Sequence, residues 1–382
     1  MSVANHEVVH IGFVTGDGGD AIQIMELSAE LIRKGWKTRV VVPQLETTNA
    51  FIERCYAEGI PAEQSDAVRA DIQGAQQNVF KLIWLFWKHR HAMLHLHTGD
   101  VCLPRRVLFA LGVVRPRHVV VTIQSPYDYL LAGEIRSRIW SRAVTHSICK
   151  VICPSRHCLD AQLRCGTPAD RAMMIRNCVD VGKFASGDAR RALGALNLPP
   201  GTPLIVFSAR MNRQKRPIDA LRAFLCVQNE FPQLHLVFVG AGPDVAVVEE
   251  LARKSEASAR IHFAGFQRNI QDWLAAASIW ILPTESENFS LAVLEALAAG
   301  TAVVSTRCPG NDEVLVDSRN SMLAEVGDVT ALACAIRRLL LDDKLRAGIC
   351  AEARKTADQH GLKQMADEVI RCYESILAGH PR

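Results

Sequence analysis

Two carboxylates, Glu287 and Glu295, flank the start of a predicted helix and are candidates to bind a polar ligand. Residues 291–299 are apolar except at Glu295, so we expect a helix buried between layers, with Ser290 as its N-cap and Gly300 as its stop. A buried carboxylate needs hydrogen-bond donors, which the vicinal hydroxyls of a ribose would supply. Unpaired amides at the first turn, with the helix dipole, favour a phosphate or a sugar hydroxyl beside Glu287.

Two cations, Arg210 and Lys215, follow a strand predicted at residues 204–208. Parallel α/β sheets bind ligands at the carboxyl ends of their strands, so these side chains are placed to meet an anion. A guanidinium and an ammonium group together are suited to neutralising a diphosphate. The alternative is a solvated run of charge without a ligand.

A glycine-rich loop at residues 15–20 lies between a predicted strand at 8–14 and a helical pattern that continues through Ile32. Strand, glycine turn and helix form a dinucleotide-type opening, in which Gly18 and Gly19 would let the backbone approach a phosphate. The pattern is not a full GxGxxG, so a nicotinamide site is not expected. An ordinary tight turn between a strand and a helix stays open as the alternative.

The run from Glu287 to Leu291, followed by Glu295, resembles the E-x7-E signature of the retaining glycosyltransferases of family 4, which have the two-domain GT-B fold. The resemblance implies that Glu295 holds the ribose of a nucleotide. It also implies that Glu287 and the loop that follows it meet the donor sugar, through Asn288, Phe289, Ser290 and Leu291. An ordinary core helix with one salt-bridged glutamate is the alternative.

The same resemblance assigns further donor-binding roles. Arg210 and Lys215 stand where the family's arginine and lysine clamp the donor diphosphate, although Arg216 replaces the glycine that usually follows. The base of the nucleotide is expected near Phe266. The first glycine loop, with Gly18 and Gly19, is expected to face the diphosphate across a cleft.

The strand at 93–99 resembles the family's strand that ends in H-x-H, and His97 is the candidate to touch a ligand on the acceptor side. The spacing of His95 and His97 puts both rings on one face, which also suggests a metal. No third ligand is evident in the sequence, so we expect no metal site. Gln124 stands where many members carry a histidine; it can donate a hydrogen bond but cannot titrate, which weakens any acid–base role there.

Length and composition set the class of protein. A chain of 382 residues with 49% hydrophobic and 22% charged residues is expected to form two soluble domains. The net charge of +4 and the lack of a recognition motif argue against nucleic-acid binding. Twelve cysteines without an evident secretory leader predict a cytoplasmic protein without disulfides.

An aromatic-rich run at residues 79–87 is followed by Lys88, His89 and Arg90. Nine residues are too few to span a bilayer. The run could lie in a bilayer interface with its basic flank outside, which would place the protein peripherally on the inner face of a membrane. A helix that faces the core is the preferred interpretation.

The expected fold class is α/β, with two Rossmann-like β/α/β domains that face each other across a cleft. Residues 1–185 form the acceptor-side domain in this prediction and residues 186–362 form the donor-side domain. The composition of residues 185–203 suggests this boundary. Residues 363–382 are predicted to form a helix that crosses back to the first domain.

The resemblance implies retaining transfer of a sugar from a UDP- or GDP-sugar to a hydroxyl or amine of a small-molecule, glycan or lipid-linked acceptor. No D-x-D pair occurs, so metal-independent chemistry without a cofactor is expected. Two alternatives remain. One is a sugar-nucleotide-binding protein without transferase activity, suggested by Gln124. The other is a sugar-nucleotide epimerase, or a phosphorylase that would need pyridoxal phosphate.

Overall fold

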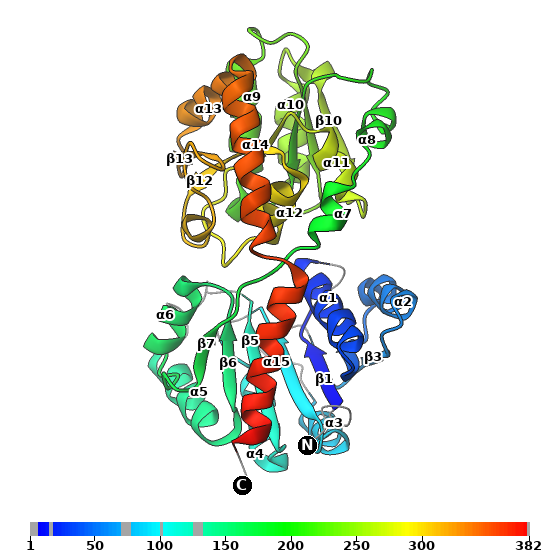
Figure 1. Ribbon diagram of the computed structural model, residues 1–382, viewed down its shortest axis with the longest axis vertical. Coiled ribbons are helices and arrows are strands. Elements are labelled where there is room, and N and C mark those ends of the chain that lie inside the picture. Colours follow the sequence, from blue (N-terminus) through cyan, green and yellow to red (C-terminus); the bar gives the residue numbers. More distant parts are fainter. Residues whose placement is uncertain (1–6, 15–17, 70–77, 100–101, 125–132, 380–382) are drawn as a thin grey trace. The chain divides into compact units, whose positions relative to one another are not determined.

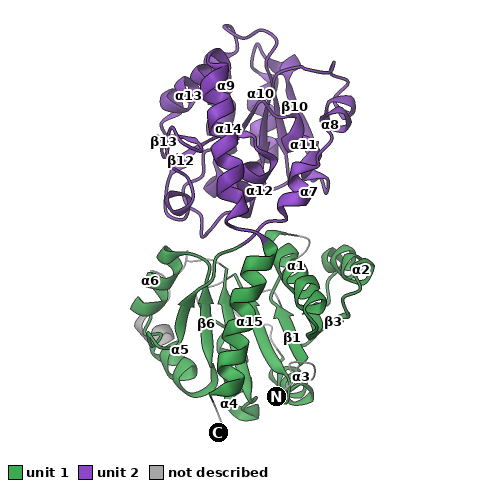
Figure 2. Cartoon of the chain, in the orientation of Figure 1, with its two compact units in different colours: residues 1–177, 362–382 green, residues 178–361 purple. Residues whose placement is uncertain are grey.

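The computed structural model describes residues 7–14, 18–69, 78–99, 102–124 and 133–379, and the chain divides into two compact units (Figure 2). Unit 1 consists of residues 1–177 and 362–382, and unit 2 of residues 178–361. The division therefore falls at 177/178 rather than at 185/186. The segment after Asn177 joins unit 2 because the Val179 amide donates to the His360 carbonyl (2.9 Å) and Phe184 is buried in the core of unit 2.

The described residues of unit 1 form a parallel seven-stranded sheet in the order β3-β2-β1-β4-β5-β6-β7. Valine, isoleucine and leucine dominate its central strands, which are buried on both faces as expected for a parallel sheet. The strands are β1 (Glu7–Gly12), β2 (Lys37–Pro43), β3 (Ala62–Ser65), β4 (Met93–Thr98), β5 (His118–Ile123), β6 (Lys150–Cys153) and β7 (Ala172–Met174).

Helices connect these strands, and the C-terminal helix joins the same unit (Figure 1). α15 packs against α1, and the Lys34 ammonium lies 2.8 Å from the Asp367 carboxylate. The helices of unit 1 are α1 (Gly19–Arg33), α2 (Asn49–Ala57), α3 (Val79–Lys88), α4 (Arg105–Val114), α5 (Gly133–Ser147), α6 (Arg156–Arg164) and α15 (Leu362–Ala378), with a 3-10 turn at Glu46–Thr48.

Unit 2 has a parallel six-stranded sheet in the order β10-β9-β8-β11-β12-β13. Its strands are β8 (Leu204–Ser208), β9 (His235–Val239), β10 (Ile261–Gly265), β11 (Ile279–Leu282), β12 (Ala302–Arg307) and β13 (Met322–Glu325). Its helices are α7 (Val181–Ala185), α8 (Ala189–Ala195), α9 (Pro217–Val227), α10 (Val245–Arg253), α11 (Ile270–Ala276), α12 (Leu291–Ala299), α13 (Val329–Leu341) and α14 (Asp343–Asp358), with 3-10 turns η4 (Arg213–Lys215), η5 (Ser258–Arg260) and η6 (Asn311–Glu313). Both units are Rossmann-like, which confirms the predicted fold class.

Each sheet has a point where the chain reverses its direction of strand addition. In unit 1 this switch point lies between β1 and β4, and in unit 2 between β8 and β11. Loops at the carboxyl ends of two such strands diverge and leave room for a ligand. Arg210 and Lys215 follow β8, and Glu287 follows β11, so these predicted site residues lie in loops at the switch point of unit 2.

Two expectations from composition are resolved by the fold. All twelve cysteines are free thiols, as predicted. Helix α3 buries Leu82, Leu85 and Phe86, but it exposes three aromatic side chains, so the expectation of a helix that faces only the core was incomplete. Within the described residues, no helix combines the length and hydropathy needed to cross a bilayer.

Candidate functional site

The loops after β8 and β11 meet at the switch point of unit 2, where Lys215 pairs with Glu287. The Lys215 Nζ lies 2.5 Å from Glu287 Oε1, and the two side chains are 18% and 7% exposed. The fold thus joins two residues that are 72 positions apart in the sequence. A nearly buried cation and a nearly buried carboxylate at this edge can bind a charged, hydroxyl-rich ligand.

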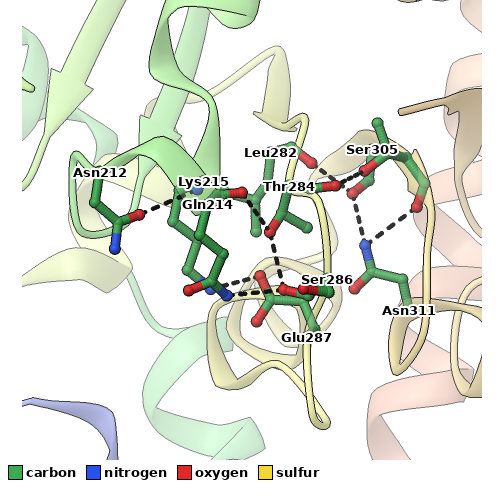
Figure 3. Close-up of polar contacts among 10 residues, drawn as sticks. Asn212, Gln214, Lys215, Leu282, Thr284, Ser286, Glu287, Ser305 and Asn311 are labelled. Carbon is green, nitrogen blue, oxygen red and sulfur yellow. Dashed lines mark hydrogen bonds and ion pairs between the residues drawn. The ribbon is translucent and has the colours of Figure 1, made fainter. Parts of the chain in front are cut away.

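Hydrogen bonds hold these two loops together, and those made by the Gln214 side chain and by Lys215 are drawn in Figure 3. The Gln214 side-chain amide donates to the Ser286 carbonyl (2.8 Å), and the Glu285 amide donates to the Gln214 carbonyl (2.8 Å). Asn212 accepts a hydrogen bond from the Lys215 amide (3.1 Å) and so caps the short turn η4. These contacts fix the position of Lys215 before any ligand binds.

A third loop, after β12, supports Glu287 from the other side. The Glu287 amide donates to the Pro309 carbonyl (2.9 Å). The Asn311 side-chain amide donates to Ser305 Oγ (3.1 Å) and to the Thr306 carbonyl (3.2 Å), as drawn in part in Figure 3. Burial, and to a smaller extent the nearby Glu287 carboxylate, raises the pKa of the Cys308 thiol to about 12. Cys308 is therefore a neutral neighbour of the site at physiological pH.

Arg210 is exposed in the loop after β8. The backbone of this loop packs closely against Gly240 and Gly242. The Met211 amide donates to the Ala241 carbonyl (2.9 Å). A Cβ atom at Gly240 would lie 2.1 Å from the Ala209 carbonyl oxygen, and one at Gly242 would lie 2.1 Å from that of Met211. Only glycine permits this close approach, which explains the glycines in the turn after β9.

Arg216 has a left-handed backbone with φ of +51°. Its guanidinium compensates for this unfavourable conformation by pairing with Asp219 (2.6 Å) and Glu285 (2.9 Å). A glycine would adopt the same backbone without strain. The substitution of the expected glycine by arginine is therefore compatible with the loop.

Helix α12 spans Leu291–Ala299 with Ser290 at its N-cap and Gly300 at its C-cap, as predicted. The Ser290 hydroxyl makes no capping hydrogen bond. Glu295, however, is half-buried rather than enclosed. A half-buried carboxylate is accessible to a ligand without the desolvation penalty of a fully enclosed one.

The other donor-side residues also lie in unit 2. Phe266 follows β10 and is 58% exposed, as a platform for a base would require. The side chain of Phe289 is buried in the core with its ring edge against His360, so only its backbone remains as a candidate to reach a ligand. Asn288 and Ser290 are buried as well, and Leu291 is half-buried.

The remaining candidates lie in unit 1. α1 begins at Gly19, with Gly18 as its N-cap, while residues 15–17 of the glycine-rich loop lie outside the described residues. His97 and Gln124 line one small cavity of about 30 Å³, together with Arg176. This volume holds about one water molecule. The backbone amide of Gln124 donates to the Thr98 carbonyl (2.7 Å), which fixes the Gln124 backbone beside β4.

A third histidine, His10, joins His95 and His97, although no third ligand was evident in the sequence. The three rings share one face of neighbouring strands because His10 pairs in register with His95. Candidate ligand atoms of the three lie within 4.8 Å of one another, and His10 Nδ1 is 3.0 Å from His97 Nε2. However, both ring nitrogens of His95 are already engaged, by Tyr373 (2.6 Å) and Thr122 (2.7 Å). That no metal binds here stays a prediction.

Complete burial lowers the pKa of His10 to about 3 and lowers the pKa values of His95 and His97 well below their usual value. The three imidazoles are therefore neutral at physiological pH. His10 escaped sequence analysis because a single histidine in a strand has no informative spacing. Only the pairing of β1 with β4 brings it to the H-x-H pair.

Gly310→Ala should destabilise the loop that supports Glu287. Gly310 has φ of +85°, and a Cβ atom there would lie 2.3 Å from the Glu287 carbonyl oxygen. We expect a loss of about 2 to 3 kcal/mol in the free energy of unfolding of unit 2, measured by urea denaturation with hydrogen exchange on its peptides.

Gly348→Ala is the matched control, because Gly348 lies inside α14 with open space around its Cβ position. That change should raise the unfolding free energy by about 0.5 to 1 kcal/mol. Equal stability of the Gly310 variant and the parent protein would show that the loop adapts.

Comparison with known proteins agrees with this geometry. Residues 189–356 match the family "Glycosyl transferases group 1", and residues 17–183 match "Glycosyltransferase Family 4". The D-inositol 3-phosphate glycosyltransferase of Corynebacterium urealyticum is 25% identical over 307 residues, which cover 74% of this chain and 71% of that protein. The N-acetyl-alpha-D-glucosaminyl L-malate synthase of Bacillus anthracis is 26% identical over 202 residues, which cover 53% of this chain and 52% of that protein. The match thus spans about half the length of that relative.

Solved structures show the same fold over nearly the whole chain. HepE of Anabaena, solved in complex with UDP-glucose, superposes with a TM-score of 0.79 at 17% identity and covers 97% of this chain and 99% of its own. WaaG, a glycosyltransferase involved in lipopolysaccharide biosynthesis, superposes with a TM-score of 0.72 at 16% identity and covers 98% of this chain and 100% of its own. The two Rossmann-like units are thus those of the GT-B fold.

Proposed function

Because the chain matches the glycosyl transferases of group 1 over residues 189–356 and glycosyltransferase family 4 over residues 17–183, we propose that it moves a sugar from a UDP-sugar to an acceptor hydroxyl or amine, with retention at the anomeric carbon and without a metal ion. The observation that carries this proposal is the contact of Lys215 with Glu287 at the switch point of unit 2. The complexes of HepE with UDP and UDP-glucose support uracil as the base. The acceptor is a small molecule, a glycan or a lipid-linked glycan.

In the proposed complex, the donor diphosphate competes with the Glu287 carboxylate for the Lys215 ammonium. Arg210 approaches the same diphosphate from its exposed position after β8. Glu287 then accepts hydrogen bonds from hydroxyls of the donor sugar, and the half-buried Glu295 accepts those of the ribose. Because the phosphate oxygens need donors and the hydroxyls need acceptors, each partner of the ion pair has a separate part of the donor to bind.

Transfer breaks the bond between the anomeric carbon and the phosphate oxygen and forms a bond from that carbon to the acceptor oxygen on the same face. The departing phosphate takes the acceptor's proton. Fixed positive charge on Arg210 and Lys215 stabilises the phosphate as its negative charge grows, which lowers the barrier. Gln124 would position the sugar by hydrogen bonding, because an amide cannot exchange a proton at this step.

Nucleotide release from a panel of UDP-, GDP- and ADP-sugars, with and without acceptors, tests this proposal. We expect UDP release from a UDP-sugar that depends on an acceptor. The product should have the donor's anomeric configuration by NMR, and the rate in EDTA should be within twofold of the rate without EDTA. Inversion of configuration, or a full loss of rate in EDTA that Mg²⁺ restores, would refute the retaining, metal-independent mechanism. UDP binding without release under any acceptor would favour the second candidate, a sugar-nucleotide-binding protein, which Gln124 in place of histidine suggests.

A further inference from the structure

Helices α3 and α4 pack side by side in unit 1, and each buries an apolar face in the core of that unit (Figure 1). α3 contributes Leu82, Leu85 and Phe86, while α4 contributes Val107 and Leu111. A helix that has buried its apolar face normally presents a polar one to solvent. The outward faces of these two helices should therefore be polar.

The outward face of α3 carries Phe80, Trp84 and Trp87, which are 83%, 59% and 55% exposed. Their spacing of four and three residues places them on one stripe of the helix. Phe109 and Val113, also exposed and four residues apart, form a similar pair on α4. We call these five side chains the aromatic patch. Large apolar side chains exposed on two helices that pack together mark a candidate interaction surface.

Positive charge predominates in the two segments that carry the aromatic patch. Residues 78–91 and 105–117 contain seven lysine and arginine residues and no aspartate or glutamate. Two carboxylates come from outside, since Asp66 pairs with Lys81 and Glu63 lies 3.4 Å from Lys88. The two segments themselves thus carry seven cations and no carboxylate. The cations are Lys81, Lys88, Arg90, Arg105, Arg106, Arg115 and Arg117.

Two of these cations lie directly against the exposed indoles. The Lys88 ammonium is 5.5 Å from the centre of the Trp84 ring, and the Arg90 guanidinium is 4.3 Å from that of Trp87. Long basic side chains can hold their charge in a polar layer while their stems lie along apolar surface. Aromatic rings with adjacent cations suit the boundary between lipid headgroups and acyl chains.

We propose that the aromatic patch docks this protein peripherally on the surface of an anionic lipid bilayer. The rings enter the headgroup boundary, and the surrounding cations contact lipid phosphates. A second copy of the chain is the other candidate occupant, but it would bring seven like charges against seven, which opposes association. An anionic surface complements both properties of the patch. The inference does not rest on the proposed sugar transfer.

Tryptophan fluorescence offers a direct test, because the two patch indoles are the exposed ones. Trp36, Trp140, Trp273 and Trp280 are at most 3% exposed. Vesicles of phosphatidylcholine and phosphatidylglycerol at 3:1 should therefore shift the emission of Trp84 and Trp87 to shorter wavelength, and brominated lipids should quench it. Sedimentation with vesicles gives the affinity. Binding should weaken when salt is raised from 0.1 to 0.5 M and should be lost on pure phosphatidylcholine.

The double variant Trp84→Ser/Trp87→Ser should bind these vesicles at least about tenfold more weakly and lose the spectral shift, because both rings then contribute nothing at the boundary. Arg105→Glu/Arg106→Glu should weaken binding as well, with both indoles intact. Leu341→Ser removes an apolar side chain that is 66% exposed in unit 2 and should leave binding unchanged.

Three results would overturn the proposal. The first is equal vesicle affinity of the double tryptophan variant and the parent protein. The second is equal binding to vesicles with and without phosphatidylglycerol. The third is no vesicle binding together with a dimer, seen by sedimentation velocity, that the double tryptophan variant abolishes. The last result would assign the patch to a second copy of this chain.

Discussion

Arg210→Ala is expected to lower the rate of sugar transfer by at least about a hundredfold, the scale of removing one group that stabilises a transition state. Arg210 is exposed at the end of β8, so its removal leaves no buried partner and should not change stability. The loss should appear mainly in kcat, because the charge on the departing phosphate grows during the reaction. Steady-state kinetics and a thermal melt of the variant check both parts.

A test of Lys215 needs a double variant, because removal of Lys215 alone leaves the nearly buried Glu287 carboxylate without its cation. Such an unpaired buried charge destabilises a protein by several kcal/mol. We therefore expect Lys215→Ala to lose both activity and stability. Lys215→Met/Glu287→Gln removes both charges and should regain stability without regaining activity.

Arg213→Ala is the matched control for both variants. Arg213 is exposed in the same turn, η4, two residues before Lys215, and carries the same charge. Its loss should leave transfer within about twofold of the parent rate if position, rather than net charge, determines catalysis. Activity of Arg210→Ala within twofold of the parent would remove that residue from the proposed mechanism.

The sequence sufficed to predict the regular elements at the carboxyl edge of unit 2. The bounds of β8 and α12 agree with the prediction, since an unbroken apolar run bounded by turn residues determines each of them. The ends of these elements also place Arg210, Lys215 and Glu287 at one edge of a parallel sheet. The direct contact of Lys215 with Glu287 needed the order β8-β11, which no local pattern contains.

Other features depend on tertiary packing and were missed for that reason. Helix α3 is apolar almost all round, and periodicity alone does not say which of its aromatic side chains find a partner. Phe86 is buried in the core, while Trp84 and Trp87 on either side of it remain exposed. The domain boundary was predicted at residue 185 because the composition becomes polar there, whereas the structure divides at 177/178. The pairing of Val179 with Gly361 joins the segment after Asn177 to unit 2.

Unit 1 should lose stability when the pH falls below about 6.5. His10, His95 and His97 are held neutral by burial in the folded protein, with the pKa of His10 lowered to about 3. Below pH 6.5 the unfolded chain binds protons that the folded chain does not, so the unfolded state is favoured as pH falls. Each histidine contributes a slope of at most about 1.4 kcal/mol per pH unit, and the three together at most about 4.

Urea denaturation at pH 7.5, 6.5 and 5.5, followed by hydrogen exchange in β1 and β4, measures this slope for unit 1. His10→Leu should reduce it by at most about 1.4 kcal/mol per pH unit, because one buried site no longer takes up a proton on unfolding. His91→Gln, at an exposed histidine next to β4, is the control and should leave the slope unchanged. If the parent protein and the His10 variant show the same dependence between pH 6.5 and 5.5, His10 does not contribute to the acid instability. A slope that is present in both but vanishes in His97→Leu would instead assign the effect to His97.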